Sequence, residues 1–275
     1  MIKRIVLYSL LFTSLLSVSA YAGTDDETAY ALNTLLFLVS GFLVMLMAAG
    51  FCMLESGMVT SKSVSTIAAK NIGLYSIAGL MFWVIGYNVA YGIPEGGYIG
   101  SFTPWSDASA IDTGYSDGSD WFFQMVFCAT TVSIVSGTLA ERIKIWPFFL
   151  FAAILTGIIY PIEMGWQWGG GWLSAAGFSD FAGSTLVHAA GGAAALAGAI
   201  VLGPRLGRFN NGKLVPFASS SIPLATLGTF ILWFGWFGFN GGSQLALAGF
   251  ENATAVATIY INTNLAACAG VMTCA

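Results

Sequence analysis

Seven apolar stretches, each close to the roughly 20 residues that a membrane-spanning helix needs, follow one another along this chain. The longest connection between them is the segment from Ile93 to Trp121. We expect the spans at approximately Tyr30–Leu54, Asn71–Gly92, Phe122–Ala140, Trp146–Met164, Ser184–Gly203, Ile222–Ala248 and Thr254–Ala275. The pattern predicts an all-α transmembrane protein.

The composition excludes a water-soluble fold. Hydrophobic residues make up 57% of the chain and charged residues 8%, whereas an ordinary soluble domain carries about 25% charged residues. So few charges cannot cover a surface that faces water. We therefore expect a lipid bilayer around the protein, and the formal net charge of -4 does not make nucleic acid a plausible partner.

The N-terminus has the pattern of a secretory signal. Lys3 and Arg4 precede an apolar run from Ile5 to Leu16, and Ala20-Tyr21-Ala22 is a small-x-small cleavage pattern. We expect residues 1–22 to be a signal peptide and residues 23–275 to form a single membrane domain, incomplete at its C-terminus. An uncleaved first span is the alternative, which the shortness of the apolar run disfavours.

The charged residues after the signal predict an orientation. Every basic residue falls in an alternate loop, and the intervening segments carry acids. The basic residues are Lys62, Lys70, Arg142, Lys144, Arg205, Arg208 and Lys213; the acids are Asp25, Asp26 and Glu27, then Glu95, Asp107, Asp112, Asp117 and Asp120 in the longest loop. By the positive-inside rule, the N-terminus faces outward across the inner (plasma) membrane.

The end of the sequence and the four cysteines carry two further predictions. The chain stops at Ala275 inside its seventh apolar stretch, without a basic or polar tail, so we expect a fragment of a longer protein. The four cysteines lie in apolar stretches without CxxC spacing, and we expect no metal and no cofactor. A redox enzyme of the membrane would need several haem or metal ligands, so we expect no enzyme.

His188 is the only histidine in the chain and lies in the fifth predicted span. Ionisable groups at that depth usually face a pathway for protons or ligands, so we expect a functional role. Ser184 lies one helical turn before it on the same face. Asp180 opens the helix, where its carboxylate can accept the free amides of the first turn and can also favour a cation outside.

Aromatic residues gather toward the outer side of the spans. Phe123 and Phe127 lie four residues apart, as do Phe239 and Ser243, and three glycines follow Trp168. Ring faces attract ammonium-like ions by about 0.5 to 2 kcal/mol each, so these residues are a candidate cation site. An interfacial aromatic belt is the other interpretation, and depth alone does not decide between them.

Several motifs resemble those of ammonium transporters of the Amt/MEP/Rh family, in the family's order from about Ala31 to the end of the chain. Asp180-Phe181-Ala182-Gly183-Ser184-Thr185-Leu186-Val187-His188 is similar to the signature DFAGGxxVH and departs from it at Ser184. The other matching segments are Gly50–Val59 with Ser61-Lys62-Ser63, Ala140-Glu141-Arg142-Ile143, Trp168-Gly169-Gly170-Gly171 and Trp236–Ser243.

The resemblance implies a bundle of eleven helices in two inverted five-helix repeats, truncated here in the second repeat, and a homotrimer with one pore per subunit. It also implies a PII-class regulatory protein as a partner at the cytoplasmic face. Phe127, Trp168, Phe239 and Ser243 match the external ammonium-recruitment site. Phe123 matches the upper ring of the phenyl gate, with Phe239 opposite, and His188 matches the first of the twin pore histidines, which acts in the pore as a proton relay.

The function that follows is ammonium transport, with deprotonation at the phenyl gate and passage as ammonia. An ammonium sensor with the same fold is one alternative. An Rh-type gas channel is another, and the matches at Trp168 and Ser243 favour the ammonium branch instead.

Overall fold

The computed structural model describes residues 25–274, so the predicted signal peptide, residues 1–22, lies outside the described residues. Within the described part, seven helices are long and apolar enough to cross a membrane. They run over Asp26–Met58, Ser61–Tyr91, Asp117–Leu139, Ile145–Gly165, Ser184–Leu202, Ile222–Gly242 and Phe250–Cys274. The predicted all-α architecture with seven spans is confirmed.

Three spans consist of several helical segments. The single-segment spans are α2 (Asp26–Met58), α5 (Asp117–Leu139), α10 (Ile222–Gly242) and α11 (Phe250–Cys274). The second span consists of η2 (Ser61–Ser63), α3 (Val64–Met81), η3 (Phe82–Gly86) and α4 (Tyr87–Tyr91). The fourth consists of α6 (Ile145–Ile154), η5 (Leu155–Ile159) and α7 (Tyr160–Gly165). The fifth consists of η6 (Ser184–Ala189) and α9 (Ala190–Leu202). Outside them lie η4 (Ile111–Thr113), α8 (Trp172–Ala175) and the hairpin β1 (Phe209–Asn210) and β2 (Lys213–Leu214).

Capping side chains begin two of the long helices. The Asp25 carboxylate accepts the amide of Thr28 at 2.7 Å at the start of α2. Ser221 caps α10 by accepting the amide of Leu224, and Pro223 follows in the first turn, where its missing N–H costs nothing.

The sixth span is shorter than the sequence predicts, because α10 ends at Gly242 and not at Ala248. Leu245 has a positive φ of 62°, which breaks the helical path after the glycines. The side chain of Asn33 on α2 then accepts the amides of Leu247 and Ala248 at 2.8 and 3.1 Å. This long-range contact holds the segment as a loop, which its apolar composition could not reveal.

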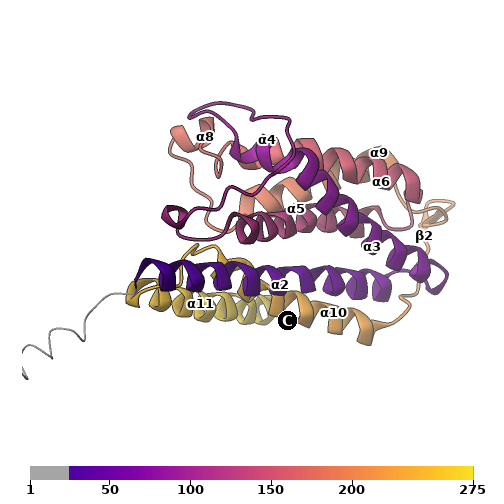
Figure 1. Ribbon diagram of the computed structural model, residues 1–275. Helices are drawn as coiled ribbons and strands as arrows, with labels where there is room; N and C mark the ends of the chain where they lie inside the picture. The colour runs from indigo at the N-terminus through magenta and orange to yellow at the C-terminus, as the bar shows by residue number, and fades with distance from the viewer. Residues whose placement is uncertain (1–24, 275) are drawn as a thin grey trace, which may run out of the picture.

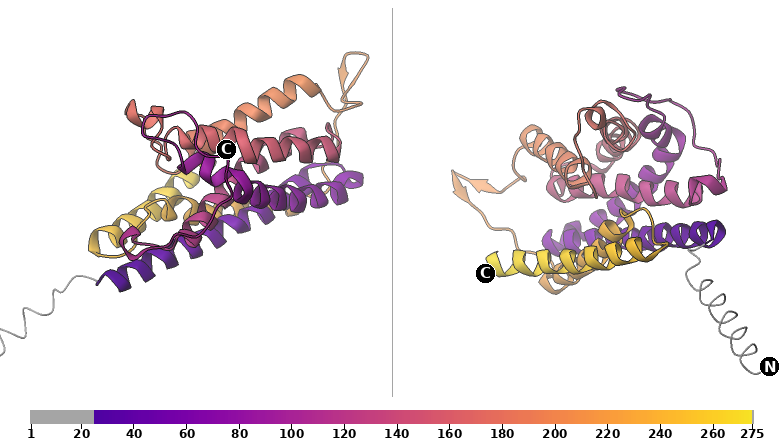
Figure 2. Two further views of the ribbon diagram at one scale, coloured as in Figure 1. Left: turned by 45° about the horizontal axis from the view of Figure 1, so that its top comes forward. Right: turned by 90° about the vertical axis from the view of Figure 1, so that its left-hand side faces the viewer.

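The helices lie in two layers. Figure 1 shows α2, α10 and α11 in one layer and α3, α5, α6 and α9 in the other, and the views in Figure 2 agree. The helix α2 packs mainly against α10 within its layer and against α5 across the layers. Because α5 also packs against α3 and α9, it is the most buried span, with 78% of its apolar window inside the protein.

Glycines let α2 and α10 approach closely. A Cβ at Gly228 would lie 2.5 Å from the Leu54 amide nitrogen, and one at Gly57 would lie 2.5 Å from the Ala225 nitrogen. Backbone cannot move away as a side chain can, so this seam requires residues without a side chain. Small residues at a helix contact allow such close approach in membrane proteins.

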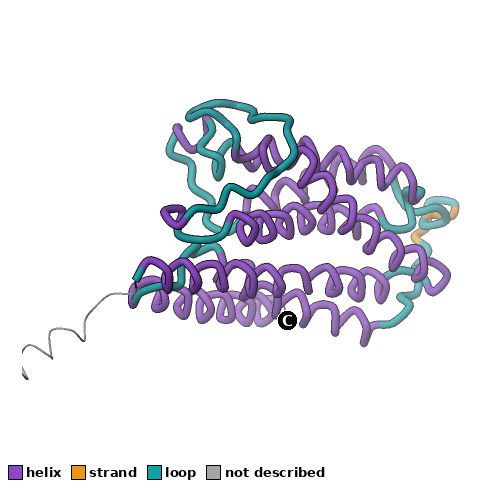
Figure 3. Tube along the Cα trace, in the orientation of Figure 1, coloured by secondary structure: helices purple, strands orange, loops and turns teal. Residues whose placement is uncertain are grey.

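The connections sort to opposite ends of the bundle. Segment 92–116 and α8 lie at the end where α2 begins, and the β1–β2 hairpin lies at the other end (Figures 1 and 3). The acidic loop therefore lies opposite the basic hairpin loop, as the alternation of charges predicts.

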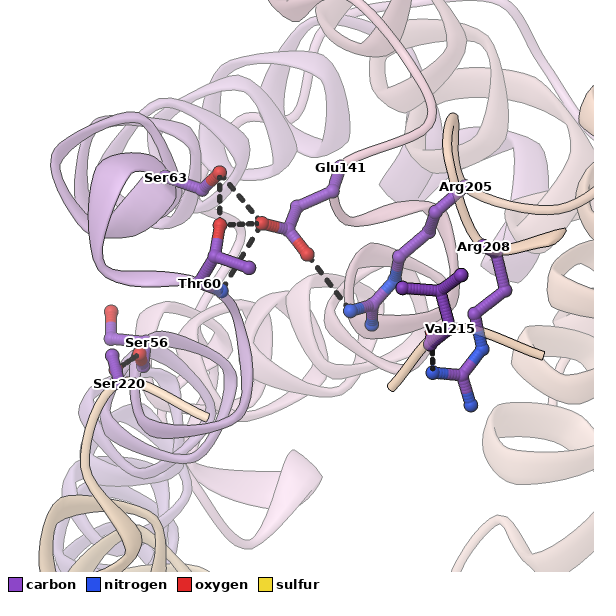
Figure 4. Close-up of polar contacts among 8 residues, drawn as sticks. All are labelled: Ser56, Thr60, Ser63, Glu141, Arg205, Arg208, Val215 and Ser220. Atoms are coloured by element: carbon purple, nitrogen blue, oxygen red, sulfur yellow. Dashed lines mark hydrogen bonds and ion pairs between the residues drawn. The ribbon is translucent and has the colours of Figure 1, made fainter. Parts of the chain in front are cut away.

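Glu141 joins three connections at the hairpin end (Figure 4). One carboxylate oxygen accepts the Thr60 amide at 3.1 Å and the Ser63 hydroxyl at 2.7 Å, and it also accepts the Thr60 hydroxyl. The other oxygen pairs with Arg205 at 2.8 Å. Burial acts to raise the pKa of Glu141, but these hydrogen bonds and the charge of Arg205 outweigh it and hold that pKa below its usual value.

The sequence predicts Lys70 in a loop, but the second span begins at Ser61 and Lys70 is buried within α3. Its ammonium lies 3.0 Å from the Glu55 carboxylate and donates to the Ser136 carbonyl at 2.7 Å. Asn71 and the Ser136 hydroxyl donate to the same carboxylate oxygen of Glu55, at 3.2 and 3.0 Å. An opposite charge on the neighbouring helix allows this lysine to be buried.

Candidate functional site

A series of aromatic contacts runs from Trp168 to His188. The centroid of the Trp168 ring lies 5.9 Å from that of Phe127, and Phe127 stacks on Phe239 with centroids 4.0 Å apart and an interplanar angle of 22°. The Phe239 ring in turn meets the His188 imidazole edge-on at 5.3 Å. Residues from four separate segments thus form one continuous line of rings.

A hollow of about 340 Å³ opens beside this line. We call it the outer hollow; its lining includes Phe127, Trp168 and Ser243, three of the four residues predicted to recruit the substrate. The hydroxyl of Ser243 donates to the Phe239 carbonyl at 2.9 Å, which leaves its oxygen free to accept. Phe239, the fourth residue, is not part of this lining but stacks on Phe127, which is.

Phe123 does not stand opposite Phe239, contrary to what the family resemblance implies. The ring stacked on Phe239 is that of Phe127, whereas Phe123 packs on Phe127 at 4.7 Å and on Phe37 at 5.3 Å. Phe123 also lines the outer hollow. The four-residue spacing places both phenylalanines on one face of α5 but one turn apart in depth, and only the packing of α10 selects the deeper ring.

Local hydrogen bonds fix the position of Trp168. Its indole nitrogen donates to the Asp180 carbonyl at 2.8 Å. A Cβ at Gly183, which has a φ of +90°, would lie 3.2 Å from the indole ring, so the ring packs against a bare backbone. The indole is therefore held against the start of the fifth span.

The carboxylate of Asp180 caps that span, as predicted. It accepts the amides of Gly183, Ser184, Thr185 and Leu186 at distances from 2.8 to 3.1 Å. These are the free amides of the first helical turn, and a negative charge there is stabilised by the helix dipole. Asp180 itself lies before the helix, which begins at Ser184.

The His188 imidazole is oriented by its own helix. Its Nδ1 lies 3.1 Å from the Gly183 carbonyl oxygen, and the ring stacks on Trp236 at 5.3 Å with an interplanar angle of 15°. A carbonyl oxygen can only accept, so Nδ1 carries the hydrogen and Nε2 of the neutral ring is left as an acceptor. The ring is half-buried.

Asp120 is not among the predicted site residues, because the hydropathy pattern assigns it to the long outer loop. The structure places it in the first turn of α5, where it is 7% exposed and lines the outer hollow. Burial, and the negative charges of Asp120 and Asp117, raise the pKa of Tyr115, which also lines the hollow. The spacing of Asp120, Phe123 and Phe127 at i, i+3 and i+7 was a usable signal, since it puts all three on one helix face.

Comparison with known sequences agrees with this geometry. The profile of the Ammonium Transporter Family matches residues 35–275. The ammonium transporter Amt2 of Archaeoglobus fulgidus is 42% identical over 255 residues, which cover 86% of this chain and 52% of the relative. An ammonium transporter of Aquifex aeolicus is 36% identical over 261 residues, covering 93% of this chain and 60% of the relative.

Solved structures show the same fold. A structure described as a sensor Amt protein superimposes with a TM-score of 0.81 at 38% identity, over 88% of this chain and 61% of that one. Mep2 of Candida albicans superimposes with a TM-score of 0.70 at 28% identity, over 81% of this chain and 50% of that one. The chain spans between about half and three fifths of the length of these proteins. It is a multi-pass membrane protein and belongs to the ammonium transporter family.

Proposed function

We propose that this chain is part of an ammonium transporter, in which the outer hollow recruits ammonium and the line of rings leads to His188. The continuous contacts from Trp168 through Phe127 and Phe239 to His188 support this proposal best. They join a cation-attracting aromatic surface to the one imidazole of the chain, although the four side chains come from different helices or loops.

The ion must lose its proton near the stacked rings. Moving a charged ammonium into hydrocarbon carries an idealised cost of order 20 kcal/mol. Aromatic contacts return only about 0.5 to 2 kcal/mol each. Passage as neutral ammonia avoids this cost and excludes potassium, which has no proton to release. The stacked pair of Phe127 and Phe239 is the gate in this scheme, with Phe123 beside it on the hollow.

His188 then receives the neutral molecule or its proton. Its Nδ1 is engaged with the Gly183 carbonyl, so Nε2 is the nitrogen that can accept a hydrogen bond or a proton. Asp180 is a structural and electrostatic residue in this scheme, because its carboxylate is occupied by four backbone amides.

The setting of the chain is also part of the proposal. We place it in the inner (plasma) membrane with the α2 start outside, after removal of residues 1–22, because the basic loops alternate with acidic ones. A homotrimer and a PII-class protein at the basic face are proposed from the family resemblance.

A second candidate function is ammonium sensing. The structural match to a sensor Amt protein at 38% identity favours it as the alternative. A sensor would bind ammonium in the same hollow and pass little of it across the membrane.

Uptake of methylammonium by proteoliposomes that contain the complete gene product tests transport against sensing. We expect saturable methylammonium uptake by the wild-type protein. In the His188→Ala variant, this uptake should be lost or should become poorly selective against potassium. A wild-type protein that binds ammonium without uptake would favour the sensor. Undiminished, selective uptake by the His188→Ala variant would remove His188 from the mechanism.

A further inference from the structure

The Asp120 carboxylate is buried but only partly hydrogen-bonded. One of its oxygens accepts the Tyr87 hydroxyl at 2.6 Å, and the other accepts the Gln124 amide at 3.1 Å. An ionised carboxylate offers about four acceptor positions, so the described residues occupy about half of them. The other acceptor positions have no hydrogen-bond partner among the described residues, and the Asp120 side chain lines the outer hollow.

A role in capping the helix does not account for Asp120. Among the hydrogen bonds of the described residues, its carboxylate accepts none from a backbone amide, whereas Asp180 accepts four. Asp25 and Asp107 likewise bind backbone amides close by in sequence. Asp120 differs from these acids, because its charge is directed to side chains and to the hollow.

Among the residues that the structure describes, no cationic side chain pairs with this carboxylate. The sequence holds no Lys or Arg between residues 71 and 141, from 145 to 204, or after residue 213. All residues that line the outer hollow fall within those intervals. The ion pairs in the described part of the chain, Lys70 with Glu55 and Arg205 with Glu141, use other acids. A buried carboxylate without a cation is costly, so the hollow is electrostatically suited to a cation from outside.

The remaining walls fit a small cation with N–H donors. Trp168 and Phe127 contribute aromatic rings, which attract cations, and the Ser243 oxygen keeps accepting capacity after donating to Phe239. Ammonium has four N–H bonds and can use the carboxylate, the hydroxyl oxygen and the rings together. Rings and a hydroxyl alone would leave the charge of the ion without a counter-ion.

We propose that Asp120 is the counter-ion of the recruited cation, so that ammonium binds in the outer hollow between its carboxylate and the Trp168 and Phe127 rings. The inference rests on the proposed function and adds a substrate-binding residue that determines affinity. It also sets the class of ligand, since the hollow then binds the ammonium ion and not neutral ammonia.

Transport kinetics of Asp120→Asn test the inference. Asparagine keeps the shape and can still accept from Tyr87, but it removes the charge. In proteoliposomes with the complete gene product, we expect the KM for methylammonium to rise about tenfold, which corresponds to about 1.4 kcal/mol, with a much smaller change in the maximal rate. Asp112→Asn is the matched control, because Asp112 is an exposed acid in η4, outside the hollow, and its KM should stay near that of the wild type. Equal KM values for the two variants would overturn the inference.

The conservative variant Asp120→Glu separates charge from folding, since it should restore most of the affinity. Anomalous diffraction from crystals of the wild-type protein soaked in thallium(I) provides a readout that does not need transport. We expect a peak beside the Asp120 carboxylate that ammonium displaces, and a hollow without a peak would overturn the inference. A thallium peak without methylammonium uptake would refute transport but support the cation site. Methylammonium uptake that Asp120→Asn leaves unchanged would support transport but refute the role of Asp120.

Discussion

The rings of Phe127 and Phe239 lie 4.0 Å apart and within 22° of parallel, and they join α5 to α10 between Trp168 and His188. Both side chains are 1% exposed. In the proposed scheme, this pair is the gate between the outer hollow and His188.

Loosening this pair should weaken selectivity. Phe239→Leu keeps most of the apolar volume but removes the stacked ring and its contact with His188. We expect potassium-driven current, negligible in the wild type, to become measurable in proteoliposomes on a supported membrane. Phe230→Leu is the control, since Phe230 is exposed on the same helix and its ring stacks on Trp233. Potassium exclusion as strict in Phe239→Leu as in this control would contradict the gate.

Trp168→Leu should weaken recruitment more than passage. The lost cation–π contact predicts a rise of about twofold to thirtyfold in the KM for methylammonium, with the maximal rate less affected. Trp172→Leu is a matched control, because Trp172 stacks on Tyr98 outside the hollow. A maximal rate that falls while KM stays constant would move Trp168 from binding to a later step.

Lys70→Met should destabilise the protein strongly. It leaves the Glu55 carboxylate buried at 4% exposure without its cation, and breaking a buried pair in this way costs about 3 to 5 kcal/mol. The double variant Glu55→Gln with Lys70→Met removes both charges and should recover much of the loss. Thermal unfolding in detergent measures both, and a double variant less stable than the single one would refute this account of the pair.

The contacts of Glu141 should weaken in acid. Its pKa is held below the ordinary value of 4.5, so its contribution to stability is complete above that value and is lost as the pH falls through the lower, folded pKa. Glu141→Gln removes the titrating group. Between about pH 5.5 and about pH 3, the unfolding temperature should therefore fall more in the wild type than in this variant. Parallel curves would show that Glu141 contributes nothing to the acid dependence.

Much of the site was predictable where the signal is local. Asp180 caps the fifth span, and Trp168, Phe127 and Ser243 share one hollow, as their motifs indicate. Asp120 was not predicted, because an acid just before an apolar stretch looks like a loop residue. Only the packing of α5 against the segments carrying Tyr87 and Tyr115 turns it into a buried wall of the hollow.

The sequence by itself determined the membrane class, the seven spans and the alternation of charged connections, because hydropathy and charge are summed over neighbouring residues. The tertiary structure decided which phenylalanine faces Phe239, where α10 ends and which acid partners Lys70. Each of those choices depends on a contact between helices that are distant in the chain, and helical periodicity gives the face of a residue but not the neighbour that it meets.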